Sequence, residues 1–510
     1  MTAGMSDAGL LGAAIAADPF GGVEVPVAGG RGAGVRGSVL DAAGAAVLDL
    51  LASSLTGRAE PAVARLRGTL ADVSGIGEGG ARGGGAGGIT VPGQPGRYLP
   101  ADAALLGGVQ AHVLDLDDAH ATVRGHPSAV LLPALLSLAD EATPGEDLLA
   151  AYVVGVEVMA RLGALAGRSH HAAGWHPTAT LGGIAAAVAG ARLLGLGQQG
   201  AATAASLAAS MAGGTRAQFG SDAKPLHAGL AATAGVRAVT WARAGLTGGA
   251  GALFGPDSLA GAMSFEVTDP EYAEAVLGEG WGERWALTDP GLWVKRYPFC
   301  SAGMAVHEAA EVAGERARAA RSGRGRVGTN KSTGAGIGSQ SGVAPTADPG
   351  AGTRVVPDDV RAVRARVRPG ADAALRYGVP ATGGQGRFSL EYLVALGVLG
   401  REPVNSRFVD LDAEAVALAA RIVRADDLPG GGPRARVEVT LADGTSSTAD
   451  VTDPAGAPGR PPTPQQRHAK LAAAVGGEAA RRIEAAVAAL PGGTVGELRR
   501  TLAAVEEETL

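Results

Sequence analysis

The spacing of hydrophobic and polar residues divides the chain into a helical first half and a mixed remainder. From about Val39 to Leu253, apolar residues recur three and four positions apart, and Gly or Pro marks the breaks, as in amphipathic helices. Many of these segments carry Ala and Gly where Leu and Phe are more usual. The pattern therefore predicts closely packed helices around a broad core.

The pattern changes after about Trp293. In the stretch 434–451, apolar residues alternate with polar ones up to Asp443-Gly444, which is typical of a β-hairpin. Helical spacing returns from Thr463 onward. The sequence thus predicts a mainly α fold with a smaller α/β domain.

The predicted domains follow these changes. Residues 1–293 and 462–510 are expected to form one all-helical domain, and residues 294–461 an inserted α/β lid domain. Within the lid, Arg316 to Gly352 lacks the apolar residues needed to form a core, so we expect a disordered insertion there. A second glycine-rich stretch, Ser74 to Gly88, contains a G-x-G-x-x-G pattern without a strand before it or a helix after it. It is therefore interpreted as a flexible loop rather than a nucleotide site.

Composition narrows the class of protein. The net charge of −6 and the absence of a long basic stripe argue against a nucleic-acid partner. A single cysteine, Cys300, excludes an intrachain disulfide. The first 20 residues do not resemble a signal peptide, and the uncharged stretch from Leu193 to Thr215 is interrupted by two glutamines. We therefore expect a cytoplasmic protein with no membrane partner and a small-molecule ligand.

Four short stretches place polar residues in apolar surroundings. They are HVLDLDDAHATVRGHP from position 112, GWHPTAT from 174, DAKPLHAG from 222 and KRYPFCSAGMAVH from 295. Each has a structural interpretation as well as a chemical one. His126 and His176 each precede a proline and could cap a helix, and Lys224 could lie on the surface.

Carboxylates and histidines in the first stretch also raise the possibility of a metal site. A metal-dependent hydrolase would use Asp117, Asp118, His120 and His126. The two histidines are six positions apart, however, which does not place them on one helix face as i, i+4 ligands would be. We therefore expect no bound metal.

Taken together and in order, these stretches resemble the MmgE/PrpD family. The resemblance covers most of residues 39–500. It rests on six segments: HVLDLDDAH, GHPSAVLLPALLSLAD, GWHPTATLGGIAAAVAGARLLGL, KPLHAGLAATAGVRA, KRYPFC and GRFSLEYLVA. It implies a helical domain with a smaller lid, a homodimer, and lyase or epimerase chemistry on small polycarboxylates without a cofactor. Known members include 2-methylcitrate dehydratase, cis-aconitate decarboxylase and iminodisuccinate epimerase.

The resemblance also implies site residues. The catalytic positions fall on Asp115, His126, His176 and Lys224, and substrate contacts on Asp118, His227, Cys300, Ser301 and Tyr377. The residue types suit the chemistry. A lysine and a protonated imidazole can stabilise the negative charge that develops beside a carboxylate, and a second imidazole can transfer the proton.

The chain departs from the family pattern at two positions. Ala119 stands where many relatives carry a threonine, and Met304 stands where many carry a histidine, the nearest here being His307. We expect a cofactor-independent lyase, most simply a dehydratase of a 2-methylcitrate-like acid, with decarboxylase or epimerase activity as near alternatives. A binding protein that has lost part of the site remains the alternative of another class.

Overall fold

The computed structural model describes residues 35–74, 88–278, 280–324 and 355–509. They belong to two compact units, Met1–Arg296 with Gly456–Leu510, and Tyr297–Ala455. The first unit is helical and the second combines helices with a four-stranded sheet, so the predicted mainly α fold with a smaller α/β part is confirmed. The sequence-based boundaries lie after residues 293 and 461. The glycine-rich loop expected at 74–88 falls almost entirely outside the described residues.

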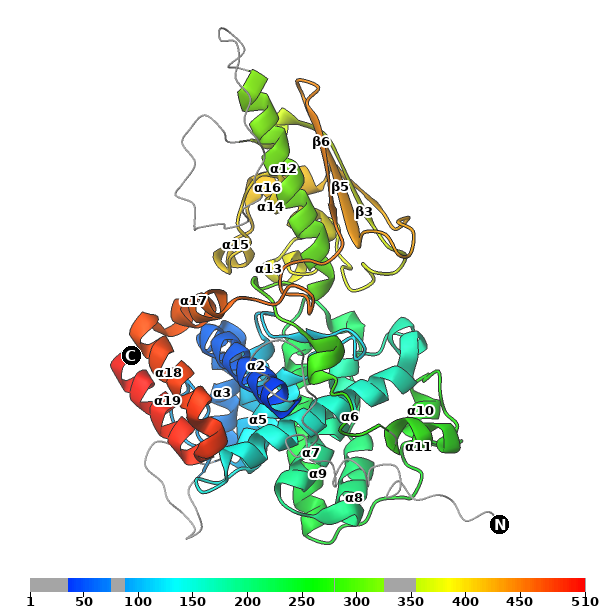
Figure 1. Ribbon diagram of the computed structural model, residues 1–510, viewed down its shortest axis with the longest axis vertical. Coiled ribbons are helices and arrows are strands. Elements are labelled where there is room, and N and C mark those ends of the chain that lie inside the picture. Colours follow the sequence, from blue (N-terminus) through cyan, green and yellow to red (C-terminus); the bar gives the residue numbers. More distant parts are fainter. Residues whose placement is uncertain (1–34, 75–87, 279, 325–354, 510) are drawn as a thin grey trace. The chain divides into compact units, whose positions relative to one another are not determined.

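The first unit is built from helices that precede the second unit in the sequence and from helices that follow it. In chain order its longer helices are α2 (Val35–Gly57), α3 (Pro61–Ser74), α4 (Pro100–His112), α5 (Ser128–Leu138), α6 (Gly145–Ala172), α7 (Pro177–Leu193), α8 (Gly197–Ala209), α9 (Ala223–Arg243), α11 (Pro270–Gly278), α17 (Pro464–Val475), α18 (Gly477–Ala489) and α19 (Val495–Thr509). The C-terminal helices α17 and α18 pack against α2, near the start of the described chain (Figure 1).

Small residues bring the central helices α4, α7 and α9 into close contact. A Cβ atom at Gly108 of α4 would lie 2.7 Å from the Cα of Gly229 in α9, and one at Gly235 would lie 2.5 Å from the Ala186 side chain in α7. Larger side chains at these positions would force the helices apart. The contact between α4 and α9 positions the site, because His112 ends α4 and Lys224 begins α9.

Among the residues that the structure describes, two helices are long and apolar enough to cross a membrane. In Gly37–Gly57 61% of the apolar window is buried inside the protein, and in Gly145–Ala172 89% is. Helix α6, which contains the second window, contributes Leu149, Tyr152 and Val156 to the core. This burial is typical of core helices.

A two-stranded β-ladder joins the polar loop after α4 to the residues just before the chain enters the second unit. Strand β1 (Ala119–His120) pairs antiparallel with β2 (Leu292–Trp293), and Ala119 lies opposite Trp293. Continuing this register by two residues in each direction leads from Ala119 back to Asp117 and from Trp293 on to Lys295. The short ladder therefore brings Lys295 beside the acidic loop.

In the second unit, helix α12 (Met304–Arg324) packs against helix α14 (Leu390–Val398) and also against the sheet (Figure 1). The sheet order is β4 (Ile422–Ala425), β3 (Val360–Val367), β5 (Ala435–Leu441) and β6 (Ser446–Val451). β5 and β6 form an antiparallel hairpin, which confirms the hairpin expected from the alternating residues.

One prediction for the second unit is wrong in part. Disorder was expected from Arg316, yet α12 continues through Arg324. Alanine and arginine favour helix, and three arginines of this segment bond to the same unit. Arg316 donates to the Thr448 carbonyl, Arg318 to the Val398 carbonyl, and Arg321 pairs with Asp359. The remainder of the expected insertion, residues 325–352, lies outside the described residues.

Candidate active site

Polar side chains gather in the first unit where α4 ends, α5, α7 and α9 begin, and β2 leads into Lys295. The participants are His112, Asp115, Asp117, His126, His176, Lys224, His227 and Lys295, all less than 9% exposed. Ionisable groups are rarely buried unless they are paired. So many in one place mark this cluster as the candidate active site.

Asp115 lies at the centre of the positive charge. Its Oδ1 atom is 2.5 Å from Lys295 Nζ, 3.4 Å from Lys224 Nζ and 3.7 Å from His126 Nε2. Burial alone would raise the pKa of Asp115, but Lys224 and Lys295 outweigh it and hold the pKa well below its usual value. Asp115 is therefore ionised, accepts a hydrogen bond from Lys295 and forms an ion pair with Lys224.

The backbone at Asp115 is also unusual. Its φ is 53°, in the left-handed region that few residues other than glycine and asparagine or aspartate adopt readily. Lys295 Nζ donates to the backbone carbonyl of Asp115 at 2.9 Å as well as to its carboxylate. The other carboxylate oxygen, Oδ2, is buried and has no hydrogen-bond partner among the described residues. An unpaired buried acceptor suits a donor group of a ligand or a water molecule.

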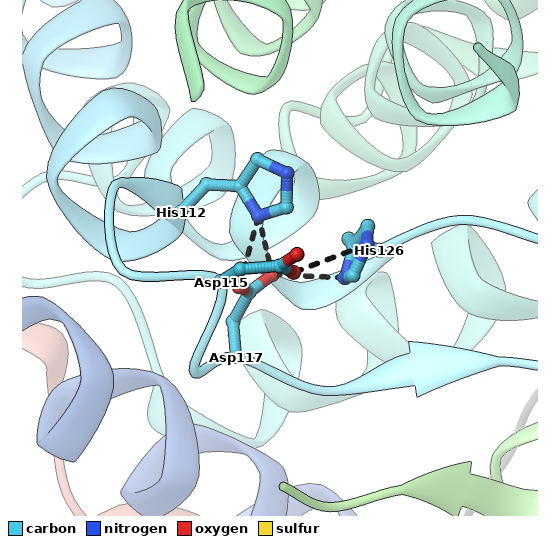
Figure 2. Close-up of side chains that lie close together, drawn as sticks. All are labelled: His112, Asp115, Asp117 and His126. Carbon is cyan, nitrogen blue, oxygen red and sulfur yellow. Dashed lines mark hydrogen bonds and ion pairs between the residues drawn. The ribbon is translucent and has the colours of Figure 1, made fainter. Parts of the chain in front are cut away.

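His112 links a second carboxylate to Lys224. Its Nδ1 lies 2.8 Å and 3.0 Å from the two carboxylate oxygens of Asp117 (Figure 2). Lys224 Nζ lies 2.6 Å from its Nε2. Burial, with a further contribution from Lys224, lowers the pKa of His112 to about 4. The ring is thus neutral, donates from Nδ1 to Asp117 and accepts from the lysine at Nε2.

His126 has its tautomer fixed by the backbone. Its Nδ1 lies 2.7 Å from the carbonyl oxygen of Asp118 and 3.3 Å from Asp117 Oδ2. A carbonyl can only accept, so Nδ1 carries the proton and the lone pair of a neutral ring is on Nε2, toward Asp115. Burial and then Lys295 lower the pKa of His126. The ring is therefore neutral, with its lone pair on Nε2.

His176 and His227 form a pair. Their Nδ1 atoms are 3.0 Å apart, so one ring donates to the other. Burial and then Lys224 lower the pKa of His176, and burial and then His112 lower that of His227 to about 4. Although His176 precedes the first residue of α7, its side chain makes no capping bond. The capping interpretation of His176 is therefore wrong, and so is the surface interpretation of Lys224, which is 3% exposed.

The other residues predicted to contact the substrate are not part of this cluster. The carboxyl group of Asp118 accepts from Ser128 Oγ, which also bonds to the Tyr152 hydroxyl, and burial followed by Asp49 raises its pKa to about 7. Cys300, Ser301 and Tyr377 belong to the second unit. A substrate contact by any of these four residues stays a prediction.

The residues named for the metal-hydrolase alternative do not come together as a set. His120 donates from Nε2 to the Ala286 carbonyl and lines a separate hollow of about 300 Å³ with Glu157 and Arg161. Within the described residues, the group that could surround a cation is His112, Asp115, Asp117 and His126, each offering an atom within 4.8 Å of the others (Figure 2). Lys295 and Lys224 already pair with Asp115. This donor set therefore fits a divalent cation poorly.

Sequence reasoning missed two residues of the cluster, His112 and Lys295. Both lie in quoted stretches, His112 at the start of HVLDLDDAH and Lys295 at the start of KRYPFC. The one available signal for His112 was its place three residues before Asp115, about one helical turn. For Lys295, the one feature of the sequence that could have indicated a site residue was a charge within an apolar stretch.

Comparison with known proteins gives the cluster a family context. Residues 6–273 match the MmgE/PrpD N-terminal domain. The chain is 35% identical over 232 residues to cis-aconitate decarboxylase of Homo sapiens, covering 44% of this chain and 46% of that protein. It is 39% identical over 109 residues to the cis-aconitate decarboxylase-like protein oryM of Aspergillus oryzae, covering 20% and 23%. The mouse (Mus musculus) cis-aconitate decarboxylase is 34% identical over 167 residues, covering 31% and 34%. The chain thus spans less than half the length of each of these curated relatives.

Proposed function

The chain belongs to the MmgE/PrpD family, and from this membership and the site we propose that it is a cofactor-independent lyase that removes CO2 from a small unsaturated polycarboxylate resembling cis-aconitate. The observation that carries the proposal is the burial of two ammonium groups beside neutral histidines. Lys224 and Lys295 supply fixed positive charge, and His126 and His176 supply groups that exchange protons. The decarboxylase is preferred to the dehydratase because the curated relatives above bear that name.

Loss of CO2 breaks the bond between a carbon atom and one carboxylate. The electron pair of that bond stays on the carbon skeleton and is delocalised toward a neighbouring carboxylate. A proton is then added at carbon, so one proton is consumed for each CO2 released. The protein must therefore stabilise negative charge and deliver one proton.

Lys224 is the group proposed to stabilise the charge. It is buried and held by His112 and Asp115, so its ammonium is oriented before the reaction begins. Oriented charges in a site that excludes water stabilise developing negative charge far better than solvent does.

His176 is the proposed proton donor, and its partner His227 stabilises the form that results. In the empty site burial and Lys224 lower the pKa of His176. A substrate with several carboxylates brings negative charge into the cluster, and negative charge raises the pKa of a nearby imidazole. Substrate binding would therefore favour the protonated ring just when a proton is required.

Dehydration of a hydroxy-polycarboxylate is the second candidate. The observation that favours it is the unpartnered Oδ2 of Asp115, an acceptor that would suit a substrate hydroxyl group. A binding protein without activity is the third, because Ala119 and Met304 lack the polar groups of many relatives.

Incubation with citrate-like and aconitate-like acids, followed by mass spectrometry, separates these candidates. We expect loss of CO2 from an unsaturated tricarboxylate. Loss of water from a hydroxy acid would favour the dehydratase, and binding without any conversion would favour the third candidate.

A further inference from the structure

His112 occupies a place between a buried carboxylate and the proposed charge-stabilising lysine. Its side chain and that of Asp117 are both 0% exposed, and its ring lies 4.4 Å from the His126 ring, between centroids. It therefore has no route to solvent, and its two ring nitrogens already bond to Asp117 and Lys224. Its hydrogen bond to Lys224 connects it directly to the proposed charge-stabilising group.

The two hydrogen bonds have directions that depend on each other. Burial alone would raise the pKa of Asp117, but the ring N–H groups of His112 and His126 and the charge of Lys295 hold it well below the usual value, so Asp117 is ionised. An ionised carboxylate only accepts, so His112 must donate from Nδ1. The neutral ring then has a lone pair on Nε2, which accepts from Lys224 at 2.6 Å.

The helices fix this arrangement. His112 is the last residue of α4 and Lys224 is the second residue of α9, and the two helices touch at Gly108 and Gly229. Phe219 lies under the lysine, with Nζ 5.4 Å from the ring centre. The ammonium is thus bounded by His112, Asp115 and an aromatic face.

We propose that His112 is a positioning residue whose neutral ring, oriented by Asp117, holds the Lys224 ammonium in the direction needed to stabilise charge on the substrate. This inference rests on the proposed function, since it assigns His112 a part in the same reaction. It goes beyond that function by adding an Asp117–His112–Lys224 relay to the site.

Two substitutions separate the bonds of His112. In His112→Gln, the amide end reaches about as far as Nε2, so its oxygen can still accept from Lys224. In His112→Asn, the amide lies near Nδ1, so its nitrogen can still donate to Asp117, but the side chain at position 112 no longer reaches Lys224. The two variants therefore differ chiefly in which partner of His112 they keep.

We expect His112→Asn to lower kcat by on the order of tenfold or more relative to His112→Gln, the scale on which partners that orient an active-site group act. KM should change less than kcat, and circular dichroism should confirm that both variants are folded. A structural role would instead be indicated by equal kcat values, or by a higher kcat in His112→Asn, and either result would overturn the proposal.

A second readout does not depend on turnover. Nitrogen-15 NMR of histidine-labelled protein, with His112 assigned by its absence in His112→Gln, reports the tautomer. We expect the neutral form with the proton on Nδ1 at pH 7, and a change on Asp117→Asn substitution. A proton on Nε2 in the unsubstituted protein would overturn the relay. If the unsubstituted protein converts no polycarboxylate while the tautomer is as expected, the proposed function fails and the relay geometry stands.

Discussion

Lys295 Nζ lies 2.5 Å from Oδ1 of Asp115 and 2.9 Å from the backbone carbonyl of the same residue. One ammonium group thus pairs with the carboxylate of the central aspartate and also bonds to its backbone, which is in the left-handed conformation. The two residues are 180 positions apart in the sequence. The short pairing of β1 with β2 is what brings their segments together.

Removal of Lys295 is expected to destabilise the fold. Lys295→Met should lower the free energy of unfolding by about 3 kcal/mol, near the lower end for breaking a buried ion pair, because Lys224 still lies 3.4 Å from Asp115. Adding Asp115→Asn removes the uncompensated charge and keeps a residue that tolerates positive φ. Urea unfolding of the two single variants and the double variant should therefore show a non-additive effect of about 1 kcal/mol or more. Strict additivity would mean that the pair is not coupled.

Close packing of α4 on α9 is expected to be required for the site. Gly229→Ala would place a Cβ against the Leu105 carbonyl and 2.8 Å from Val109 Cγ2, and overpacking of this kind costs about 1–3 kcal/mol. Turnover should fall too, because the same contact positions His112 beside Lys224. The matched control is Gly68→Ala in α3, where a Cβ meets nothing within 4 Å. The control should be neutral or stabilising by up to about 1 kcal/mol, and equal melting temperatures for the two variants would contradict the packing argument.

These close contacts also show what the sequence could and could not reveal. The recurrence of small residues at helical spacing predicts helices that approach closely, and the alternation before Asp443 predicts the hairpin. The continuation of α12 through 316–324 was missed because alanine is the largest apolar residue in this segment. Its arginines bond to carbonyls and a carboxylate brought near only by the fold.

The candidate site likewise contains residues that the sequence could reveal and residues that it could not. Asp115, His126, His176 and Lys224 were selected through the family resemblance, and the structure brings all four into one cluster. His112 was missed because its partner Lys224 is 112 positions away. Lys295 was missed because a strand of two residues leaves no periodic signal.

Acid is expected to destabilise the protein through its buried histidines. Burial lowers the pKa of His112 and of His227 from 6.5 to about 4. Between these values the unfolded chain binds more protons than the native protein, so stability is lost as pH falls from 6.5 to about 4. Asp118 opposes the trend, because its pKa is raised to about 7 and the native protein binds its proton more tightly than the unfolded chain does.

The raised pKa values of Asp49 and Glu506 act in the same direction as that of Asp118. The lowered pKa values of His126, His171 and His176 act with those of His112 and His227, so we expect the histidines to outweigh the carboxyl groups. Differential scanning calorimetry should therefore show a melting temperature that decreases steadily over this range. In Asp118→Asn the decrease should be steeper, because the opposing carboxyl group whose pKa is raised to about 7 is gone. A melting temperature that rises toward pH 4 would contradict the assignment of neutral rings.

Chelation is expected to leave activity unchanged. Oδ1 of Asp115 is paired with two ammonium groups, and His112 is bonded at both ring nitrogens. Turnover should therefore be the same before and after dialysis against EDTA. Loss of turnover that is restored by one divalent ion would show instead that the cluster of His112, Asp115, Asp117 and His126 is a metal site.

The most direct test of the central claim is incubation of the protein with cis-aconitate in D2O. The account predicts release of CO2 and a product with one deuterium bound to carbon, both visible by NMR. Lys224→Met, shown to be folded by circular dichroism, should be slower by on the order of a hundredfold or more. Absence of CO2 release by the unsubstituted protein, or an undiminished rate in Lys224→Met, would contradict the assignment of this buried cluster as a decarboxylase site.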